Sequence, residues 1–485
     1  MSIEGRAMIA KKACTRCSKS KKRCDRAIPD CGLCTRFGRR CEYEVSKAPC
    51  LGPTPSQSPG SETFLASEPI APSHLKNAVI HKLEPFTPES AVSAYHQAIE
   101  PWFPIASKLQ GRVRPTWDET SLDVALLCLS ILLLTTCPSS TAKSDGNTSE
   151  LETLYLHTKS SLALAEGLGF NSFPLVQSRI LITLFEVSHG FYPAAFISIG
   201  ATLGAVDALE VHPTGDALQP HCLDGAVSDE ESILIWCGIL VLDRYIATES
   251  GPRSSLTRSR TAWLHNLLKP ALCPTHEPNQ DKNSPVSRFA RLVEASAMLD
   301  KIHSTINSPT SEQTFNMEEV MLTVKTSISL QTLLTEEILA EDHLYSGGLG
   351  LCHTALLLAF ENGTKVSCSA NATENWNSLA TTSLICILST ITSTVEVFTM
   401  GTRSIDFNYF PPLVTFLVYK AAMITTERLS MKLDTNDELA RLRTLRKFLG
   451  IVAKRWLSCE RYLKLLDEDT TPRMLKAIEQ GQGSF

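Results

Sequence analysis

Six cysteines near the start of the chain have a spacing that could bind metal. Three of them form the pattern C-x2-C-x6-C, and three more repeat it: Cys14, Cys17 and Cys24, then Cys31, Cys34 and Cys41. Structural zinc takes four ligands in a tetrahedron, so six thiolates can complete two sites only if two sulfurs are shared. The repeat points to the first cysteine of each half, Cys14 and Cys31, as the shared pair. The spacing predicts a cluster of two Zn²⁺ ions.

Disulfide bonds are the alternative use of so many cysteines. The N-terminal segment MSIEGRAMIAKK lacks the apolar stretch of a secretion signal. The other ten cysteines are scattered, and Cys128, Cys237 and Cys386 lie in apolar runs, as reduced core thiols would. The sequence therefore favours reduced cysteines and metal binding.

The cysteine-rich segment is also the most basic part of the chain. Residues 11–40 contain eleven Lys and Arg against two Asp, a net charge of +9, whereas the whole chain carries −5. Two Zn²⁺ ions and six thiolates would lower the segment to about +7. The remainder of the chain is left with −14. A small positive module on a large acidic body is the charge distribution expected of a nucleic-acid-binding protein.

This segment resembles the zinc binuclear cluster of fungal transcription factors, the Zn2Cys6 family, in its spacing and in the run KSKKRC. The resemblance implies that the residues between the second and third cysteines form a short helix in the DNA major groove. Lys21 would then read the G·C pairs of a CGG- or TCG-like half-site, and Pro29 matches a proline that is often cis in the family. Four further basic residues are expected to contact DNA, mainly through phosphates: Arg16, Lys19, Lys22 and Arg23.

Such contacts imply a particular binding chemistry. Phosphate contacts release counterions, so affinity should fall steeply with salt, but they carry no sequence information. One bidentate base contact contributes roughly 1–3 kcal/mol of discrimination. The alternative from another class is a zinc-stabilised nuclear co-regulator, or an RNA- or protein-binding module, without sequence-specific DNA binding.

The elements around the cluster divide the chain into four parts. We expect a basic N-terminal arm (1–13), the zinc module (14–45), a Pro/Ser-rich flexible linker (46–84) and a helical regulatory domain (85–480). The linker contains six prolines and no apolar heptad repeat, so it predicts no coiled coil. The protein therefore either binds as a monomer or forms a homodimer through the large domain.

The fold class that the sequence predicts is mainly α, because the long C-terminal part has helical periodicity and almost no alternating strand pattern. Residues 122–137 predict a buried helix, since the run is too short to span a bilayer and includes Asp123. Further helices are expected at 151–170, 173–190, 191–211, 230–250, 286–306, 375–400, 413–433 and 438–466. Breaks are expected at 138–148, 212–229 and 270–286.

A second resemblance covers roughly residues 85–260. The segments 99–108, 175–212 and 230–248 are similar to the fungal-specific transcription factor domain, or middle homology region. It implies a nuclear regulator, most often an activator, of the kind found in secondary-metabolite gene clusters. Partners implied are double-stranded DNA and the transcription machinery, with no membrane. The helical body either only packs, spaces and dimerises, or it also responds to a small-molecule effector held in an apolar pocket. Acidic-hydrophobic segments at 332–345 and 465–485 are candidates for contacting that machinery; the alternative is that they are solvated helix faces or frayed ends.

No enzyme motif is complete. The sequence lacks HExxH, a P-loop and G-x-S-x-G, and the glycines at 347–353 are only part of a dinucleotide fingerprint. We expect no catalytic residue and no cofactor beyond the two zinc ions. The adjacent Asp243 and Arg244 are expected to form a buried ion pair that fixes helix packing.

Overall fold

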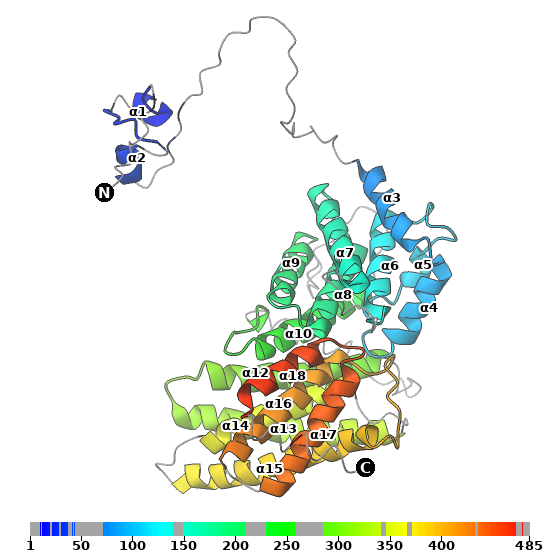
Figure 1. Cartoon of the computed structure of the whole chain (residues 1–485), viewed down its shortest axis with the longest axis vertical. Helices are drawn as coiled ribbons and strands as arrows, with labels where there is room; N and C mark the ends of the chain where they lie inside the picture. Colours follow the sequence, from blue (N-terminus) through cyan, green and yellow to red (C-terminus); the bar gives the residue numbers. More distant parts are fainter. Residues whose placement is uncertain are drawn as a thin grey trace, which may run out of the picture. The chain divides into compact units, whose positions relative to one another are not determined.

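A computed structural model describes residues 10, 12–19, 22–28, 31–36, 41, 43, 71–138, 149–209, 229–258, 285–340, 346–365, 371–431, 435–471 and 478. Regular secondary structure among them is helical throughout, which confirms the predicted fold class. The chain divides into two compact units, Met1–Glu68 and Pro69–Phe485, each with its own hydrophobic cluster. Figure 1 shows both units along the chain.

The small unit contains two five-residue helices, α1 (Thr15–Lys19) and α2 (Gly32–Arg36). Each begins directly after the first cysteine of one half of the repeat. Its core consists of cysteine sulfurs rather than hydrocarbon side chains, since the buried residues are Cys14, Cys17, Cys31 and Cys34.

The large unit begins with a group of helices that surround α8. They are α3 (Pro72–Leu83), α4 (Pro88–Ala98), α5 (Leu109–Arg112), α6 (Leu122–Thr135), α7 (Glu150–Gly167), α8 (Phe173–His189), α9 (Ala194–Ala208) and α10 (Asp229–Glu249). Helix α8 is buried along almost its whole length, and it contacts α6, α7, α9 and α10. The predicted buried helix at 122–137 is α6, whose buried residues are apolar apart from Ser130.

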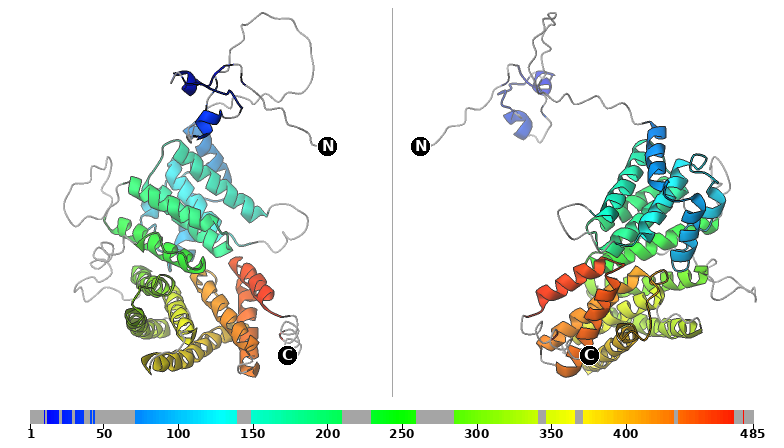
Figure 2. Two further views of the ribbon diagram at one scale, coloured as in Figure 1. Left: turned by 90° about the vertical axis from the view of Figure 1, so that its left-hand side faces the viewer. Right: turned by 45° about the vertical axis from the view of Figure 1, so that its right-hand side comes forward.

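The second group of helices surrounds α14. It comprises α12 (Pro285–Asn307), α13 (Gln313–Ala340), α14 (Gly347–Lys365), α15 (Asn371–Thr399), the short 3-10 helix η2 (Pro412–Val414), α16 (Thr415–Ser430), α17 (Thr435–Val452) and α18 (Ser458–Asp469). Helix α14 contacts α12, α13, α15 and α16. Figure 2 shows the two groups packed end to end, with α10 and α12 adjoining where they meet.

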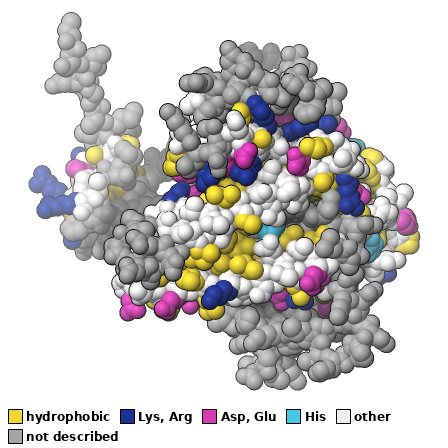
Figure 3. All heavy atoms as spheres, turned by 90° about the horizontal axis from the view of Figure 1, so that it is seen from below, with side chains coloured by type: hydrophobic (Ala, Val, Ile, Leu, Met, Phe, Trp, Pro, Cys, Tyr) yellow, Lys and Arg dark blue, Asp and Glu magenta, His cyan; other side chains and the backbone are white. Residues whose placement is uncertain are grey.

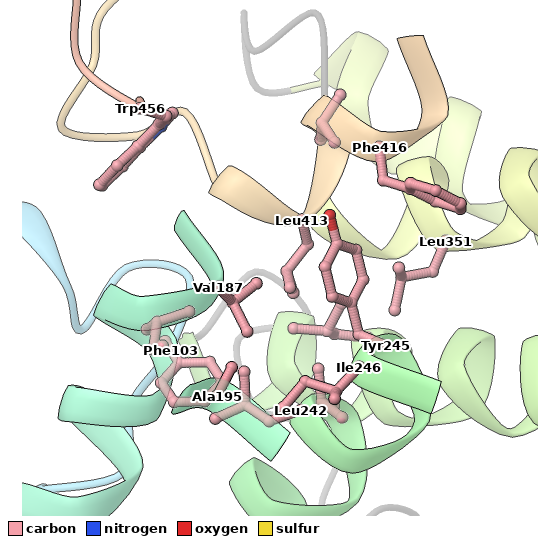
Figure 4. Close-up of a cluster of buried hydrophobic side chains, with 14 of the residues drawn as sticks. Phe103, Val187, Ala195, Leu242, Tyr245, Ile246, Leu351, Leu413, Phe416 and Trp456 are labelled. Atoms are coloured by element: carbon pink, nitrogen blue, oxygen red, sulfur yellow. The ribbon is translucent and has the colours of Figure 1, made fainter. Parts of the chain in front are cut away.

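One continuous core joins the two groups. Figure 4 shows Val187 of α8 and Tyr245 of α10 facing Leu413 of η2 and Phe416 of α16. A buried carboxylate adds a polar connection: Glu249, at the end of α10, accepts hydrogen bonds from the hydroxyls of Tyr192 and Tyr462 and pairs with Arg461. Residues 192 and 462 are far apart in sequence, so this cluster fastens the C-terminal helices to the first group.

The start of the large unit differs from the expected end of the linker at residue 84. Helix α3 occupies Pro72–Leu83 and buries Leu75, Val79 and Leu83 against the core. Pro72 stands in the first turn, where the missing N–H is no loss and the fixed φ suits a helix. The packed body therefore begins at α3, although prolines continue in the sequence beyond that point.

Two segments singled out in the sequence lie inside helices of the body. The glycine-rich run at 347–353 lies within the buried helix α14, so it is not a phosphate-binding loop. Residues 332–340 of the first acidic-hydrophobic segment belong to α13. Nearly all of the predicted breaks at 138–148, 212–229 and 270–286 lies outside the described residues, and so do residues 341–345 and nearly all of 472–485.

The predicted ion pair between Asp243 and Arg244 is wrong, because adjacent helical residues point in different directions. Asp243 accepts hydrogen bonds from the backbone N–H groups of Leu256 and Thr257 and from the Thr257 hydroxyl. Arg244 instead donates to Ser296 of α12. Both side chains fix packing, but through separate partners.

Helix α15 has a window, Trp376–Thr399, that is long and apolar enough to cross a membrane by length and composition alone. It packs one face against α14 and α17, and 33% of the window is buried. A single helix of this kind is weak support for a membrane span, since helices of protein cores have the same composition.

Candidate metal centre and nucleic-acid interface

The six cysteines of the small unit lie together in two overlapping groups of four. The sulfurs of Cys14, Cys17, Cys24 and Cys31 all lie within 4.8 Å of one another, and so do those of Cys14, Cys31, Cys34 and Cys41. Cys14 and Cys31 belong to both groups, and their sulfurs are 3.8 Å apart. Two tetrahedral zinc ions require two sets of four ligands, so this donor set fits a binuclear cluster.

Each half of the repeat positions its sulfurs in the same way. The backbone N–H of Cys17 points at the Cys14 sulfur at 3.5 Å, and the N–H of Cys34 points at the Cys31 sulfur at the same distance. Both contacts come from the turn that opens α1 or α2. Thus the C-x2-C spacing, wound into the first turn of a short helix, places two thiols beside one another.

The crowded thiols have strongly divergent pKa values. Burial alone would raise the pKa of Cys14, but hydrogen bonds from the Cys17 backbone and from neighbouring thiols lower it to about 6. The hydrogen bond to Cys14, together with burial, raises the pKa of Cys17 to about 12. Six sulfurs this close cannot all ionise unless cations compensate them, and two Zn²⁺ ions supply that charge.

Three hydrogen bonds tie down the connection between the two halves. The carboxylate of Asp25 accepts from the N–H of Gly32, 2.9 Å away, and caps the start of α2. The hydroxyl of Tyr43 donates to the carbonyl of Ala27, and the N–H of Ala10 donates to the carbonyl of Arg26. Arg26 has a positive φ of 62°, which lets the chain reverse there.

Sequence reasoning missed Asp25 and Tyr43 as supports of the module. Each directly follows a cysteine or lies two residues beyond one, which was the available signal. Aspartate is also a common capping residue at the start of a helix. The sequence alone does not show that Asp25 caps a helix beginning seven residues later, because that contact depends on how the backbone between them folds.

The predicted DNA-contacting residues are only partly described. Lys19 ends α1, and Lys22 and Arg23 follow it; all three side chains are exposed. Arg16 lies in α1, but its side chain, like Lys21 and Pro29, lies outside the described residues. The described part of this segment therefore presents basic side chains at and just beyond the end of α1.

The family described as "Fungal Zn(2)-Cys(6) binuclear cluster domain" matches residues 12–50. The chain is 30% identical over 122 residues to "Transcription factor BOA15" of Botryotinia fuckeliana, covering 24% of this chain and 64% of that protein. It is 53% identical over 36 residues to "Oleate-activated transcription factor 1" of Saccharomyces cerevisiae, covering 7% of this chain and 3% of that protein.

These matches cover less than two thirds of either relative's length. They nevertheless agree with the cysteine geometry and confirm the first resemblance drawn from the spacing. The chain carries a fungal Zn(2)-Cys(6) binuclear cluster domain, which binds two zinc ions, and its relatives are fungal transcription factors.

Proposed function

We propose that this protein is a nuclear, sequence-specific DNA-binding transcription factor rather than an enzyme. The observation that carries the proposal is the pair of overlapping four-cysteine groups within a segment of charge +9. The family match at residues 12–50 and the two fungal transcription factors support it.

In this proposal the six cysteines hold two Zn²⁺ ions, with Cys14 and Cys31 bridging. Helix α1 and the residues after it enter the major groove, where Lys21 reads a G·C pair of a CGG- or TCG-like half-site. Four further basic side chains contact the DNA, mainly through its phosphates: Arg16, Lys19, Lys22 and Arg23. Positive charge near the phosphates provides affinity, and the single base contact provides limited selectivity.

The helical body serves regulation in this proposal. Residues 69–485 have a continuous core and a net charge of −11, opposite in sign to the zinc module. We assign it homodimerisation, response to a small-molecule effector and contact with the transcription machinery. The second resemblance extends the proposal to activation of a fungal secondary-metabolite gene cluster.

Selection from a random pool of duplex DNA tests this function. The zinc-loaded full-length protein should enrich a CGG- or TCG-like triplet at near-physiological salt, singly or in spaced pairs. Binding to the selected duplex should weaken steeply as salt rises, because counterions are released from the phosphates.

The variant Lys21→Ala tests the assigned base contact. It should keep two zinc ions and bind DNA, but it should lose roughly 1–3 kcal/mol of discrimination at one base pair. The matched control is Lys12→Ala, which removes an exposed positive charge ahead of the cluster and should weaken binding to all sequences alike. Unchanged base preference in Lys21→Ala would contradict its role.

The second candidate is a zinc-stabilised co-regulator that binds protein or RNA. The same selection distinguishes the two functions. A folded protein with two zinc ions that enriches no DNA sequence would favour the co-regulator.

A further inference from the structure

Helix α15 presents an outward face without charge. From Trp376 to Val395 the sequence contains no Asp, Glu, Lys, Arg or His. One side of this stretch is buried at helical spacing: Trp376, Ala380, Leu384, Leu388, Ile391 and Val395. The other side is exposed, and only 33% of the most apolar part of α15 is buried. Leu379 is 54% exposed and Ile385 is 36% exposed.

Four hydroxyl groups along this helix have already used their hydrogen-bond donors within it. The hydroxyls of Thr382, Thr390, Ser393 and Thr394 each donate to the backbone carbonyl four residues earlier in α15. A hydroxyl bonded in this way turns its carbon atoms outward and loses little when water is removed. The face therefore behaves as a low-polarity surface although it is rich in Ser and Thr.

The surroundings in the folded body show where this face lies. Helix α15 lies lowest in Figure 1, and it is packed against α14 and α17. Figure 3 looks at the body from that end, and hydrophobic side chains gather there in a strip across the middle of the face, with acidic and basic side chains around it. Exposed apolar strips of this kind mark interaction surfaces.

We propose that the outward face of α15 is the surface through which two copies of this chain associate, by antiparallel pairing of their α15 helices about a two-fold axis. In such an interface each patch meets itself, so any charge on it would oppose a like charge. A surface with no charge from Trp376 to Val395 meets that condition without a complementary partner. Small Ser and Thr side chains also allow two helices to approach closely. The proposed function enters this inference at one point, the role of the dimer, which is to bring two zinc modules to two half-sites on DNA.

Cys386 lies near the middle of the charge-free stretch and is exposed. In an antiparallel pair the central residue of each helix lies close to its own copy at the two-fold axis. The charge-free stretch is about 30 Å long at 1.5 Å per residue, so one helix from each copy supplies the contact. We therefore expect a weak dimer that two linked half-sites on DNA strengthen.

Charge substitutions at the centre of the face give a direct test. In the full-length, zinc-loaded protein, Cys386→Glu alone and Cys386→Lys alone should each weaken self-association at least tenfold, because like charges meet at the axis. An equimolar mixture of the two variants should associate again, at least as tightly as the unsubstituted protein. Sedimentation equilibrium without DNA measures all three samples.

Leu322 of α13 provides the matched control, since it is 62% exposed on another helix. Leu322→Glu and Leu322→Lys should leave self-association unchanged. A protein that stays monomeric at hundreds of micromolar, or Cys386 variants that associate as wild type does, would overturn the proposal. Failure of the mixture to recover would rule out antiparallel pairing centred on Cys386. None of these readouts involves DNA, so the DNA-binding function is judged separately by the selection experiment.

Discussion

At the scale of single residues, the six cysteines are not equivalent. Cys14 and Cys31 belong to both four-sulfur groups, whereas each of the other four belongs to one. A ligand shared by two metal ions affects both when it is lost, while a terminal ligand directly affects only its own ion.

This asymmetry predicts different zinc contents for two matched variants. Cys14→Ser should bind no zinc tightly, because both groups then lack a thiolate. Cys34→Ser should keep one ion in the intact group of Cys14, Cys17, Cys24 and Cys31. Zinc per chain, measured by atomic absorption after dialysis, checks this. Equal zinc content in the two variants would contradict the bridging assignment.

Glu249 allows a prediction about pH. Burial raises its pKa above the ordinary value of 4.5, although hydrogen bonds from Tyr192 and Tyr462 and the charge of Arg461 act in the opposite direction. Above pH 4.5 the unfolded chain loses this proton first, so the free energy of unfolding falls as pH rises until the folded carboxyl also ionises. In Glu249→Gln this contribution is absent.

Thermal unfolding of both proteins across pH 4 to 7 measures the difference. The stability of Glu249→Gln relative to wild type should increase as pH rises through this window and then level off. A constant difference would mean that the pKa of Glu249 is the same in the folded and unfolded chain.

At the scale of elements, the packing of helices depends on glycines whose environments differ sharply. Gly363 in α14 lies against α15, and an added Cβ would be 2.7 Å from the Ala380 Cβ and 2.8 Å from the Trp376 Nε1. Gly204 in α9 has nothing within 4 Å of the same position. The first glycine permits a close helix crossing, whereas the second only lowers helix propensity.

The two alanine variants should therefore shift stability in opposite directions. Gly363→Ala should lose about 1–3 kcal/mol through overpacking, while Gly204→Ala should gain up to about 1 kcal/mol. Denaturant unfolding followed by circular dichroism checks both. If Gly363→Ala is as stable as wild type, α14 and α15 do not approach as closely as described.

At the scale of the whole molecule, the two units have cores of different chemistry. The small unit depends on sulfur and metal, and the large unit depends on apolar helix packing. Among the described residues of the large unit, no three His, Cys, Asp or Glu side chains form a metal-binding group.

Zinc removal should therefore unfold the small unit and leave the large unit folded. A strong chelator should abolish DNA binding and unfold the small unit, because structural zinc supplies its folding energy. The melting temperature and helical circular dichroism of the large unit should change little. Collapse of the helical signal on chelation would show that the body also depends on metal.

Much of this architecture could be predicted because its signals are local. The C-x2-C-x6-C spacing indicated the shared roles of Cys14 and Cys31, and the apolar run at 122–137 indicated the buried helix α6. Helix α3 was missed because Pro72 was taken to block a helix that it in fact begins.

The sequence by itself determined the zinc chemistry, the basic charge of the module and the helical class of the body, because spacing, charge and periodicity depend on neighbours in the chain. Only the tertiary structure decided that Asp25 caps α2, that Glu249 joins Tyr192 to Tyr462, and that one side of α15 stays exposed. Each of these depends on which segments meet in the folded chain. The periodicity of side chains shows which face of a helix is apolar, but it does not show which other segment packs against that face.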